Sequence, residues 1–301
     1  MISRLFRYLV TLLPQHAISR VVHRLARWRW RPWKNLLIKG FTRAYGVDRG
    51  EAAASESNAY VSFNAFFTRP LAPGVRPVAD TRGAMVSPVD GVISQHGAVS
   101  DGRLIQAKRQ DYSVTELLGG DEQLADAFRN GHFATLYLSP RDYHRVHMPV
   151  TGSLVRMLHV PGRLFGVSRP LVRHVPRLFA RNERVVGLFD TDRGPMAMVL
   201  VGAIGVGSIE TVWAGEVTPP RGHRIRNWDY QHDSPALEAG EEMGRFNLGS
   251  TVILLFADAT LQWADGIAED QPVRMGQALG YFDIAASPSG TPPGEGDHVG
   301  E

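Results

Sequence analysis

The sequence contains no cysteine among its 301 residues. Disulfide bonds, thiolate metal sites and a cysteine nucleophile are therefore excluded. It also lacks any uninterrupted apolar run close to the roughly 20 residues that a membrane-spanning helix needs. The apolar run at residues 8–13 is short even for the core of a signal peptide, and no small-residue cleavage site clearly follows it.

Acidic residues are missing from the first part of the chain. No Asp or Glu precedes Asp48, and the remainder of the chain is acidic on balance. A basic end on an otherwise acidic protein indicates a polyanionic partner, either nucleic acid or anionic lipid. The cations of this stretch are Arg4, Arg7, Arg20, Arg24, Arg27, Arg29, Arg31, Lys34, Lys39 and Arg43.

The apolar spacing of the same stretch favours lipid. Apolar residues recur at helical intervals on both sides of Pro14, which ends or kinks the first helix. Trp28, Trp30 and Trp33 then alternate with arginines, and tryptophan prefers the bilayer interface. We predict peripheral attachment to an anionic phospholipid membrane, on the cytoplasmic face of the cell (inner) membrane, and no nucleic-acid partner. The alternative is that both helices pack on the protein's own core.

The pattern along the chain predicts an α+β protein that is mainly β. Residues 1–60 form a basic, amphipathic helical region that runs to about Tyr45. Residues 61–286 form a β-rich sandwich or barrel-like catalytic body, and residues 287–301 a disordered tail. Within the body, helical periodicity is regular only at residues 114–129. The clearest strand signals are residues 83–94, 132–138, 152–156, 196–201, 204–209 and 251–256.

Candidate chemistry begins with Gly249-Ser250, directly before an apolar strand. Taken alone, Gly-Ser at a strand entrance is a common turn. His144 and His147 add two side chains whose pKa lies near neutrality, so they could act as bases or acids. A metal site would need further ligands, which are not evident, and we predict no metal. Asp90 stands between Val89 and Gly91, as a turn residue or as a carboxylate that orients a histidine.

A fourth segment, residues 63–70, carries aromatic residues that read as core, together with Arg69, which is either structural or anion-binding. Taken in order, these segments resemble the phosphatidylserine decarboxylase family over residues 63–282. The resemblance rests on the motifs at residues 66–69, 87–91, 143–147, 149–152, 161–162, 182–184, 248–251 and 276–282. The Leu-Gly-Ser-Thr motif at 248–251 is specific when the histidine segment precedes it. The basic N-terminal helices are similar to those of bacterial members that sit on the inner membrane.

The resemblance implies a proenzyme that cuts itself between Gly249 and Ser250. The Ser250 hydroxyl would attack the carbonyl carbon of Gly249, with His147 as its base and Asp90 orienting His147. Glycine at 249 would leave the attack unhindered and allow unusual backbone angles. The products are a β chain (residues 1–249) and an α chain (residues 250–301) that starts with a pyruvoyl group made from Ser250.

The resemblance also implies the second reaction. The pyruvoyl cofactor would form a Schiff base with phosphatidylserine and act as an electron sink while CO2 leaves, which gives phosphatidylethanolamine. His144 would supply the proton. The alternatives are a pyruvoyl-dependent decarboxylase of another amine, a serine hydrolase that stays intact, and a non-catalytic membrane adaptor. Edge strands in a β-rich body are compatible with a homodimer.

Overall fold

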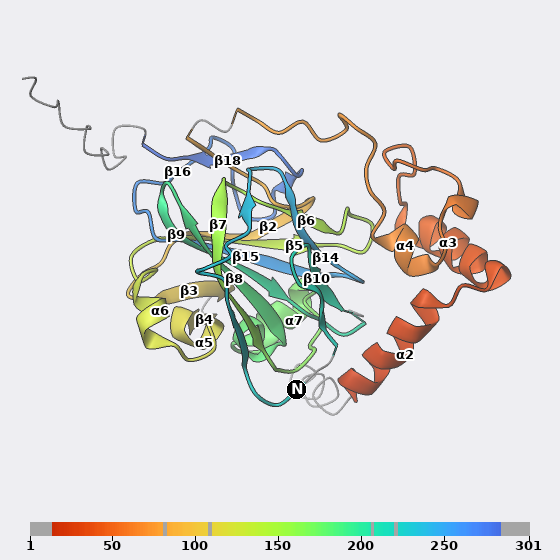
Figure 1. The fold of residues 1–301 in the computed structure, drawn as a ribbon, viewed down its shortest axis with the longest axis horizontal. Coiled ribbons are helices and arrows are strands. Elements are labelled where there is room, and N and C mark those ends of the chain that lie inside the picture. Colours follow the sequence, from red (N-terminus) through yellow and green to blue (C-terminus); the bar gives the residue numbers. More distant parts are fainter. Residues whose placement is uncertain (1–13, 81–82, 108–109, 206–207, 220–221, 284–301) are drawn as a thin grey trace, which may run out of the picture.

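The computed structural model describes residues 14–80, 83–107, 110–205, 208–219 and 222–283. The first predicted apolar helix (residues 1–13) and the predicted tail (residues 287–301) lie outside the described residues. So does the side chain of Ser250, whose backbone is described. The described chain starts with helices and continues into a body of β-sheets, which confirms the predicted α+β class (Figure 1).

Two helices form the described N-terminal region. Helix α2 (Gln15–Arg27) begins directly after Pro14, and α3 (Arg31–Tyr45) ends at Gly46, whose φ is 64°. Proline is tolerated at a helix start and a left-handed glycine commonly ends one, so the sequence sets these boundaries. The predicted end near Tyr45 is confirmed, and α2 starts directly after Pro14; the helix predicted before Pro14 lies outside the described residues. A 3-10 turn, η1 (Ser57–Ala59), and a short helix, α4 (Phe63–Phe67), follow.

A nine-stranded antiparallel sheet forms the centre of the body. Its main order is β12-β7-β8-β9-β15-β5-β2-β17, and β13 pairs with β7 beside β12. These strands are β2 (Gly91–Ala98), β5 (His132–Leu138), β7 (Gly152–Val160), β8 (Arg184–Thr191), β9 (Gly194–Val201), β12 (Arg226–Asp229), β13 (Ala236–Leu237), β15 (Ser250–Phe256) and β17 (Pro272–Val273).

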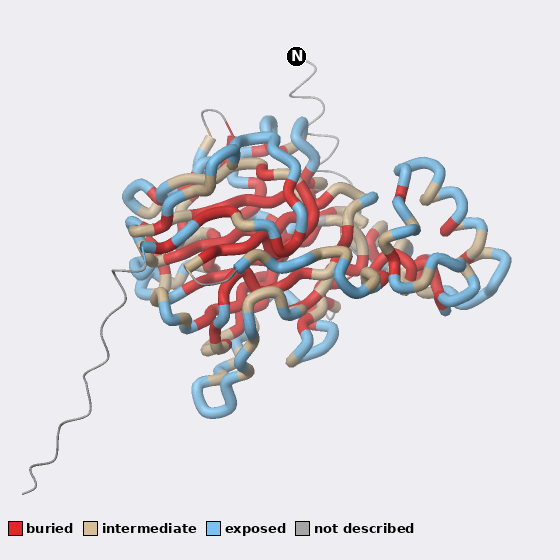
Figure 2. Tube along the Cα trace, turned by 90° about the horizontal axis from the view of Figure 1, so that it is seen from above, coloured by how far each residue is buried: buried red, intermediate tan, exposed pale blue. Residues whose placement is uncertain are grey.

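Side chains of the central strands alternate between two cores. In β15, Val252 and Leu254 enter one hydrophobic cluster, whereas Ile253 and Leu255 enter another. This is the period of two that an extended strand imposes. Because both faces are covered, the strand reads in the sequence as a continuous apolar run. The buried trace in Figure 2 follows these strands through the middle of the body.

Two smaller sheets cover one face of the large sheet and supply residues to its first core. The four-stranded sheet has the order β11-β10-β14-β6, and the three-stranded sheet has the order β1-β18-β16. The predicted sandwich is therefore confirmed. Their strands are β1 (Ala84–Val86), β6 (Arg145–His147), β10 (Ile209–Thr211), β11 (Gly215–Thr218), β14 (Glu242–Phe246), β16 (Gln262–Trp263) and β18 (Ala278–Tyr281).

Short helices and a hairpin supply apolar residues to the second core, on the other face. They are β3 (Arg103–Ala107), β4 (Gln110–Ser113), α5 (Val114–Leu117), α6 (Glu122–Asp126), α7 (Arg169–His174) and α8 (Leu178–Arg181). The single helix expected at residues 114–129 is wrong, because Gly119 and Gly120 adopt φ of 86° and 96° between α5 and α6. The strand expected at 204–209 is also wrong: residues 204 and 205 form a turn, and β10 begins only at Ile209.

A third hydrophobic cluster joins the N-terminal helices to the body. It contains Ile38 of α3 and the three phenylalanines of α4, and Leu248 packs against it. On α2, His23 and Arg27 bind Glu216 of β11 at 3.0 and 2.9 Å. Lys34 points inward and donates to the carbonyl oxygen of Ser57 at 2.6 Å. The helices are thus anchored to the body, and part of the predicted cationic set serves that anchoring.

Candidate active site

The predicted cleavage point lies in a three-residue turn between β14 and β15. Leu248 has φ of 123°, a value that is strained for a residue with a side chain. Gly249 has an ordinary φ, so the unusual backbone angle expected at Gly249 belongs instead to its neighbour. No described atom lies within 4 Å of the position that a Cβ of Gly249 would take. The Cα of Gly249 thus faces open space where a side chain would lie, and a strained residue precedes it.

Asn247 holds this turn from two sides. Its backbone N–H donates to the carbonyl oxygen of Ser208 at 2.9 Å, and its side-chain amide donates to the Ser208 hydroxyl. Its Oδ1 accepts from Nδ2 of Asn64, on α4, at 2.8 Å. Because Arg27 also donates to the Ser208 hydroxyl at 3.2 Å, one hydrogen-bonded chain connects α2, the turn and α4.

Asp90 and Ser250 lie at the same end of the large sheet. Ser250 pairs with Leu138 of β5, and β2 runs along the other side of β5 from Gly91 onward. A Cβ on Gly91 would lie 2.5 Å from the carbonyl oxygen of Tyr137, so only glycine permits this approach. Two strand spacings place the backbones of residues 91 and 250 roughly 10 Å apart.

Asp90 is buried, at 8% exposure, and paired with a cation. Arg76 donates to its carboxylate through Nε at 2.9 Å and Nη2 at 2.6 Å, and the backbone N–H of Met275 donates at 2.9 Å. Arg76 in turn binds Glu51 at 2.6 Å. These carboxylates raise the pKa of the Arg76 guanidinium above its usual range. These three hydrogen bonds hold the Asp90 side chain in a fixed position.

His147 is also buried, and the ring has a defined tautomer. Its Nδ1 donates to the carbonyl oxygen of Gly240 at 2.8 Å, and its Nε2 accepts from the Tyr143 hydroxyl at 3.0 Å. Burial lowers the pKa of His147, against the opposing fields of Glu242 and Asp90. The ring is therefore the neutral form with a basic Nε2. Burial raises the pKa of Tyr143 to about 12, so its hydroxyl remains a donor.

The predicted pairing of Asp90 with His147 is only partly reproduced by the geometry. The two residues are neighbours, because the His147 N–H donates to the carbonyl oxygen of Pro88 at 2.9 Å. Among the described hydrogen bonds, however, neither ring nitrogen of His147 binds Asp90. The Gly240 carbonyl orients the ring, and Asp90 acts on it through space. Tyr143 belongs to the same sequence motif as the two histidines, but nothing in the sequence predicted the hydrogen bond between its hydroxyl and His147.

His144 lies in a different environment from His147. It is fully buried, and its Nδ1 donates to the carbonyl oxygen of Asp142 at 2.8 Å. Its Nε2 is buried and has no hydrogen-bond partner among the described residues. The ring centroid lies 4.1 Å from that of Phe67. Burial lowers the pKa of His144 to about 3, so the ring is neutral and Nε2 carries a free lone pair.

Helix α4 therefore contacts both parts of the site. Phe67 packs on His144, Asn64 binds Asn247, and the strained Leu248 packs against the aromatic cluster of this helix. The aromatic residues are core, as predicted from the sequence. The contact of Asn64 with the cleavage turn was not predicted, since a single asparagine among phenylalanines carries no signal of its partner.

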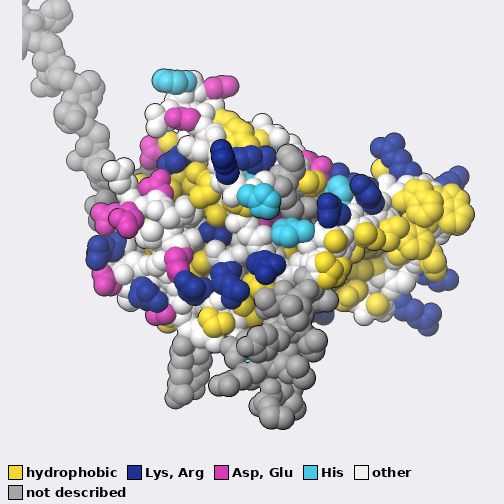
Figure 3. Space-filling view, turned by 90° about the horizontal axis from the view of Figure 1, so that it is seen from below, with side chains coloured by type: hydrophobic (Ala, Val, Ile, Leu, Met, Phe, Trp, Pro, Cys, Tyr) yellow, Lys and Arg dark blue, Asp and Glu magenta, His cyan; other side chains and the backbone are white. Residues whose placement is uncertain are grey.

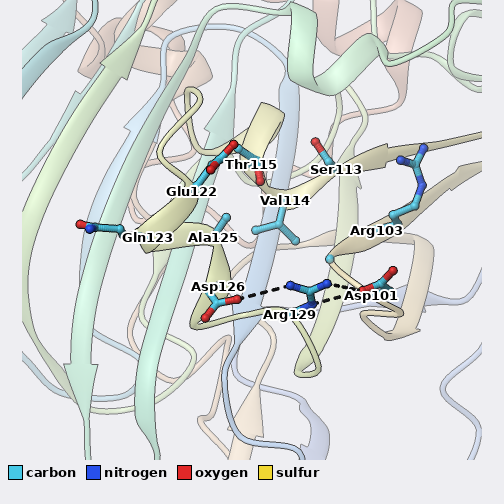
Figure 4. Close-up of a pocket in the computed structure, with 11 residues that line it drawn as sticks. Asp101, Arg103, Ser113, Val114, Thr115, Glu122, Gln123, Ala125, Asp126 and Arg129 are labelled. Atoms are coloured by element: carbon cyan, nitrogen blue, oxygen red, sulfur yellow. Dashed lines mark hydrogen bonds and ion pairs between the residues drawn. The ribbon is translucent and has the colours of Figure 1, made fainter.

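A cavity of about 370 Å³ opens beside Asp90 and Tyr143. Its walls come from the loop after α3, the start of β2, the segment after β5 and the region around β17. The lining is rich in charge and includes Asp90, Asp142, Arg69, Arg76, Arg141 and Arg274. A second pocket of about 590 Å³ lies between β3, α5 and α6, and contains none of the predicted site residues (Figure 4).

No group of three or more potential metal-binding side chains (His, Cys, Asp or Glu) occurs within the described ranges. The two histidines have no hydrogen-bond partner in common among the described residues: His144 binds the carbonyl oxygen of Asp142, and His147 binds Gly240 and Tyr143. The arrangement can instead supply a neutral histidine base next to the segment of Asp90, and a second buried histidine with a free nitrogen beside the strand end that leads into the strained turn. A charged cavity lies at the end of the sheet where that turn lies.

Comparison with known proteins gives a consistent result. Residues 63–281 match the family model described as phosphatidylserine decarboxylase, and residues 5–46 match a model described as PSD. The chain is 55% identical to the phosphatidylserine decarboxylase proenzyme of Azotobacter vinelandii, with 94% of this chain and 99% of the relative covered. It is 60% identical to the proenzyme of that name from Alkalilimnicola ehrlichii, covering 81% and 85%.

Proposed function

The chain belongs to the phosphatidylserine decarboxylase family, and on that premise we propose that it converts phosphatidylserine to phosphatidylethanolamine and CO2, using a pyruvoyl group formed from its own Ser250. One observation carries the proposal. The family's Leu-Gly-Ser-Thr motif forms a strained turn at the same end of the large sheet as Asp90, and β14, which leads into this turn, pairs with the strand that carries His147.

Self-cleavage would begin at the Gly249 carbonyl. His147 Nε2 would give up its hydrogen bond with Tyr143, form one with the Ser250 hydroxyl, and take the proton of that hydroxyl. The serine oxygen bonds to the Gly249 carbonyl carbon, the peptide C–N bond breaks, and the proton passes to the released amine. Loss of the Ser250 α-proton then expels the Gly249 carboxylate. Water converts the remaining dehydroalanine to pyruvoyl and ammonia.

The environment of residue 250 fits such a group. Its backbone is held by strand pairing at the start of β15, and the neighbouring Gly249 leaves open space. The charged cavity lies beside Asp90, at the start of β2 on the other side of β5. When present, the pyruvoyl group supplies an electron sink for the carbon that loses CO2. Residues of this chain would hold the headgroup and move its protons.

We assign proton transfer in decarboxylation to His144. In the described tautomer its Nε2 is a free acceptor, so it cannot donate a proton until it has received one. The ammonium group of phosphatidylserine must lose protons before the amine can react. When the anionic headgroup lies beside it and favours the protonated ring, His144 would take one of these protons and later deliver it to the carbon that lost CO2.

We also propose peripheral binding to the cytoplasmic face of the cell membrane through α2, α3 and the tryptophans between them. Trp28 and Trp30 are 50% and 56% exposed, and Arg29 and Arg31 beside them are exposed too. Figure 3 shows hydrophobic side chains gathered on this projection with cations around them. None of the helices in the described ranges is long and apolar enough to cross a membrane. The homodimer remains a prediction.

The test is an assay of the purified protein with phosphatidylserine in detergent micelles and, separately, with free serine. We expect CO2 release from phosphatidylserine alone, insensitivity to fluorophosphonates, and no activity in Ser250→Ala. Release from free serine at a comparable rate would favour the decarboxylase of another amine. Labelling of Ser250 by a fluorophosphonate in an intact chain would favour the hydrolase.

A further inference from the structure

Arg69 is a buried cation that forms no ion pair with any described residue. Its side chain is almost fully buried, with the residue 4% exposed. Its Nη2 reaches the carbonyl oxygen of Arg141 only at 3.5 Å, and its buried Nε has no hydrogen-bond partner. The guanidinium lies 5.2 Å from the centroid of the Phe66 ring. Burying a charge without close partners is costly, and the carboxylates of Glu51, Asp90 and Asp48 act on Arg69 only through space.

Arg184 shows how this protein satisfies a buried arginine that serves structure alone. Arg184 is 2% exposed, and its guanidinium donates four hydrogen bonds of 2.6–2.8 Å to backbone carbonyl oxygens. Burial lowers the pKa of Arg184 and also that of Arg69. Four close carbonyl groups compensate Arg184 for the lost water, whereas Arg69 has one carbonyl contact at 3.5 Å. A purely structural role for Arg69 would predict a similar set of acceptors.

Arg69 lines the 370 Å³ cavity beside Asp90. The other arginines of the cavity already have carboxylate partners: Arg76 binds Asp90 and Glu51, Arg274 lies 3.4 Å from Glu51, and Arg141 lies 3.8 Å from Asp142. Among the described lining residues, Arg69 is therefore the arginine without a carboxylate at ion-pair distance, and Glu51, Asp90 and Asp48 act on it only from farther away. An anion that enters this cavity would pair with Arg69.

The cavity adjoins the strand that pairs with residue 250. Gly91 and Ser139 line the cavity, and both adjoin Leu138, which pairs with Ser250. In phosphatidylserine, the reacting amine is separated from the phosphorus by two carbons and an oxygen, and from the carboxylate by one carbon. Either oxyanion can extend from an amine held at residue 250 toward Arg69.

Building on the proposed function, we propose that Arg69 binds an oxyanion of the substrate headgroup, its phosphodiester or its carboxylate. A guanidinium presents a planar fork of N–H donors that matches either group, and such charge-assisted pairs are strong when water is excluded. Arg69 then determines substrate affinity at the site where Ser250 is converted, and it takes no part in the cut itself.

The experiment compares Arg69→Met and Arg69→Lys with wild type and with Arg129→Met, an exposed arginine in a remote turn. Each purified protein is checked for complete self-cleavage and assayed with dihexanoyl-phosphatidylserine. We expect Arg69→Met to raise KM roughly 10- to 100-fold with kcat changed far less, and Arg69→Lys to recover part of the loss. Arg129→Met should match wild type.

Inhibition by two soluble amines separates the sources of the oxyanion. Phosphoethanolamine has a phosphate and no carboxylate, whereas free serine has a carboxylate and no phosphate. If Arg69→Met weakens inhibition by the first, Arg69 binds the phosphodiester; if by the second, it binds the carboxylate. Unchanged KM and unchanged inhibition in a cleaved Arg69→Met protein would overturn the proposal. A wild-type protein without decarboxylase activity would instead overturn the proposed function.

Discussion

His147 and His144 are three residues apart, yet their surroundings prepare them for different tasks. His147 has its Nδ1 proton fixed on Gly240 and its Nε2 aimed at a hydroxyl, which is the arrangement of a base that acts on a serine. His144 has an unpartnered Nε2 against an aromatic ring. In a strand-like segment, an offset of three directs side chains to opposite faces, so the two residues serve separate steps.

The pH dependence of self-cleavage should report His147. Burial lowers its pKa, so the neutral base persists below the ordinary value of 6.5. We expect a plateau at neutral pH and a fall in rate only in more acidic solution, with half-maximal cleavage below pH 6.5. Freshly synthesised proenzyme, followed on denaturing gels across a pH series, gives the measurement. A midpoint above pH 6.5 would contradict this assignment. The matched control is His174→Gln, on the exposed face of α7, which should leave the midpoint unchanged.

His144→Gln should separate the two reactions. The variant keeps a polar side chain of similar length, so we expect complete self-cleavage. Decarboxylation should fall by about 10²–10⁴-fold, the usual contribution of a positioned acid–base group. Gel analysis checks the first outcome, and CO2 release from phosphatidylserine checks the second. A cleaved variant with nearly wild-type turnover would exclude His144 as the proton carrier.

At the scale of elements, α4 links the cleavage turn to the second histidine. Asn64→Ala removes its hydrogen bond to Asn247 and leaves the aromatic cluster in place. A typical hydrogen bond contributes about 1 kcal/mol, so we expect roughly fivefold slower self-cleavage. The rate is measured on newly synthesised protein, with the exposed Asn227→Ala as control. Equal rates for the two variants would show that the turn does not depend on α4.

Elements with strong local signals were predictable from the sequence. Strand β5 matches its predicted range, 132–138, and β15 begins one residue before its predicted start at 251. Both are short, continuous apolar runs bounded by turns, a pattern that is typical of buried strands. The single helix at 114–129 was not predictable in detail. Its apolar spacing is helical, but two glycines with positive φ divide it, and spacing alone does not reveal that conformation.

The roles of the predicted site residues stay predictions, and their contacts could not be predicted from the sequence. Asp90 and the turn at Gly249 lie at the same end of the large sheet, and the backbone N–H of His147 binds Pro88, two residues before Asp90. The partner of Asp90 is Arg76, and the partners of His147 are Gly240 and Tyr143, which no local pattern specifies. Such contacts arise from strand pairing between distant segments, which the alternation of apolar residues constrains only loosely.

For the whole molecule, the position of β15 explains how a cut chain can remain one protein. The predicted cut lies directly before β15, which is hydrogen-bonded to β5 on one side and β9 on the other. Strands β17 and β18 of the same α chain pair with β2 and β1. Both products would share one sheet and one core, so we expect the two chains to co-purify and to separate only in denaturant.

Membrane binding belongs to the same scale, because it depends on the projection formed by α2 and α3. We expect sedimentation with phosphatidylserine vesicles that weakens with salt. Neutralising Arg29 and Arg31 together should weaken binding roughly 30-fold, at about 1 kcal/mol for each cation. Neutralising Arg103 and Arg129, which are exposed elsewhere on the body, is the matched control. Equal loss in both double variants would argue against a specific lipid-facing surface.

The most direct test of the central claim is the intact mass of the purified protein under denaturing conditions. The account predicts two chains, residues 1–249 and 250–301. The shorter chain should be lighter than its sequence by the elements of ammonia, because pyruvoyl replaces its first serine. A single uncut chain, or a shorter chain that begins with an ordinary serine, would contradict it.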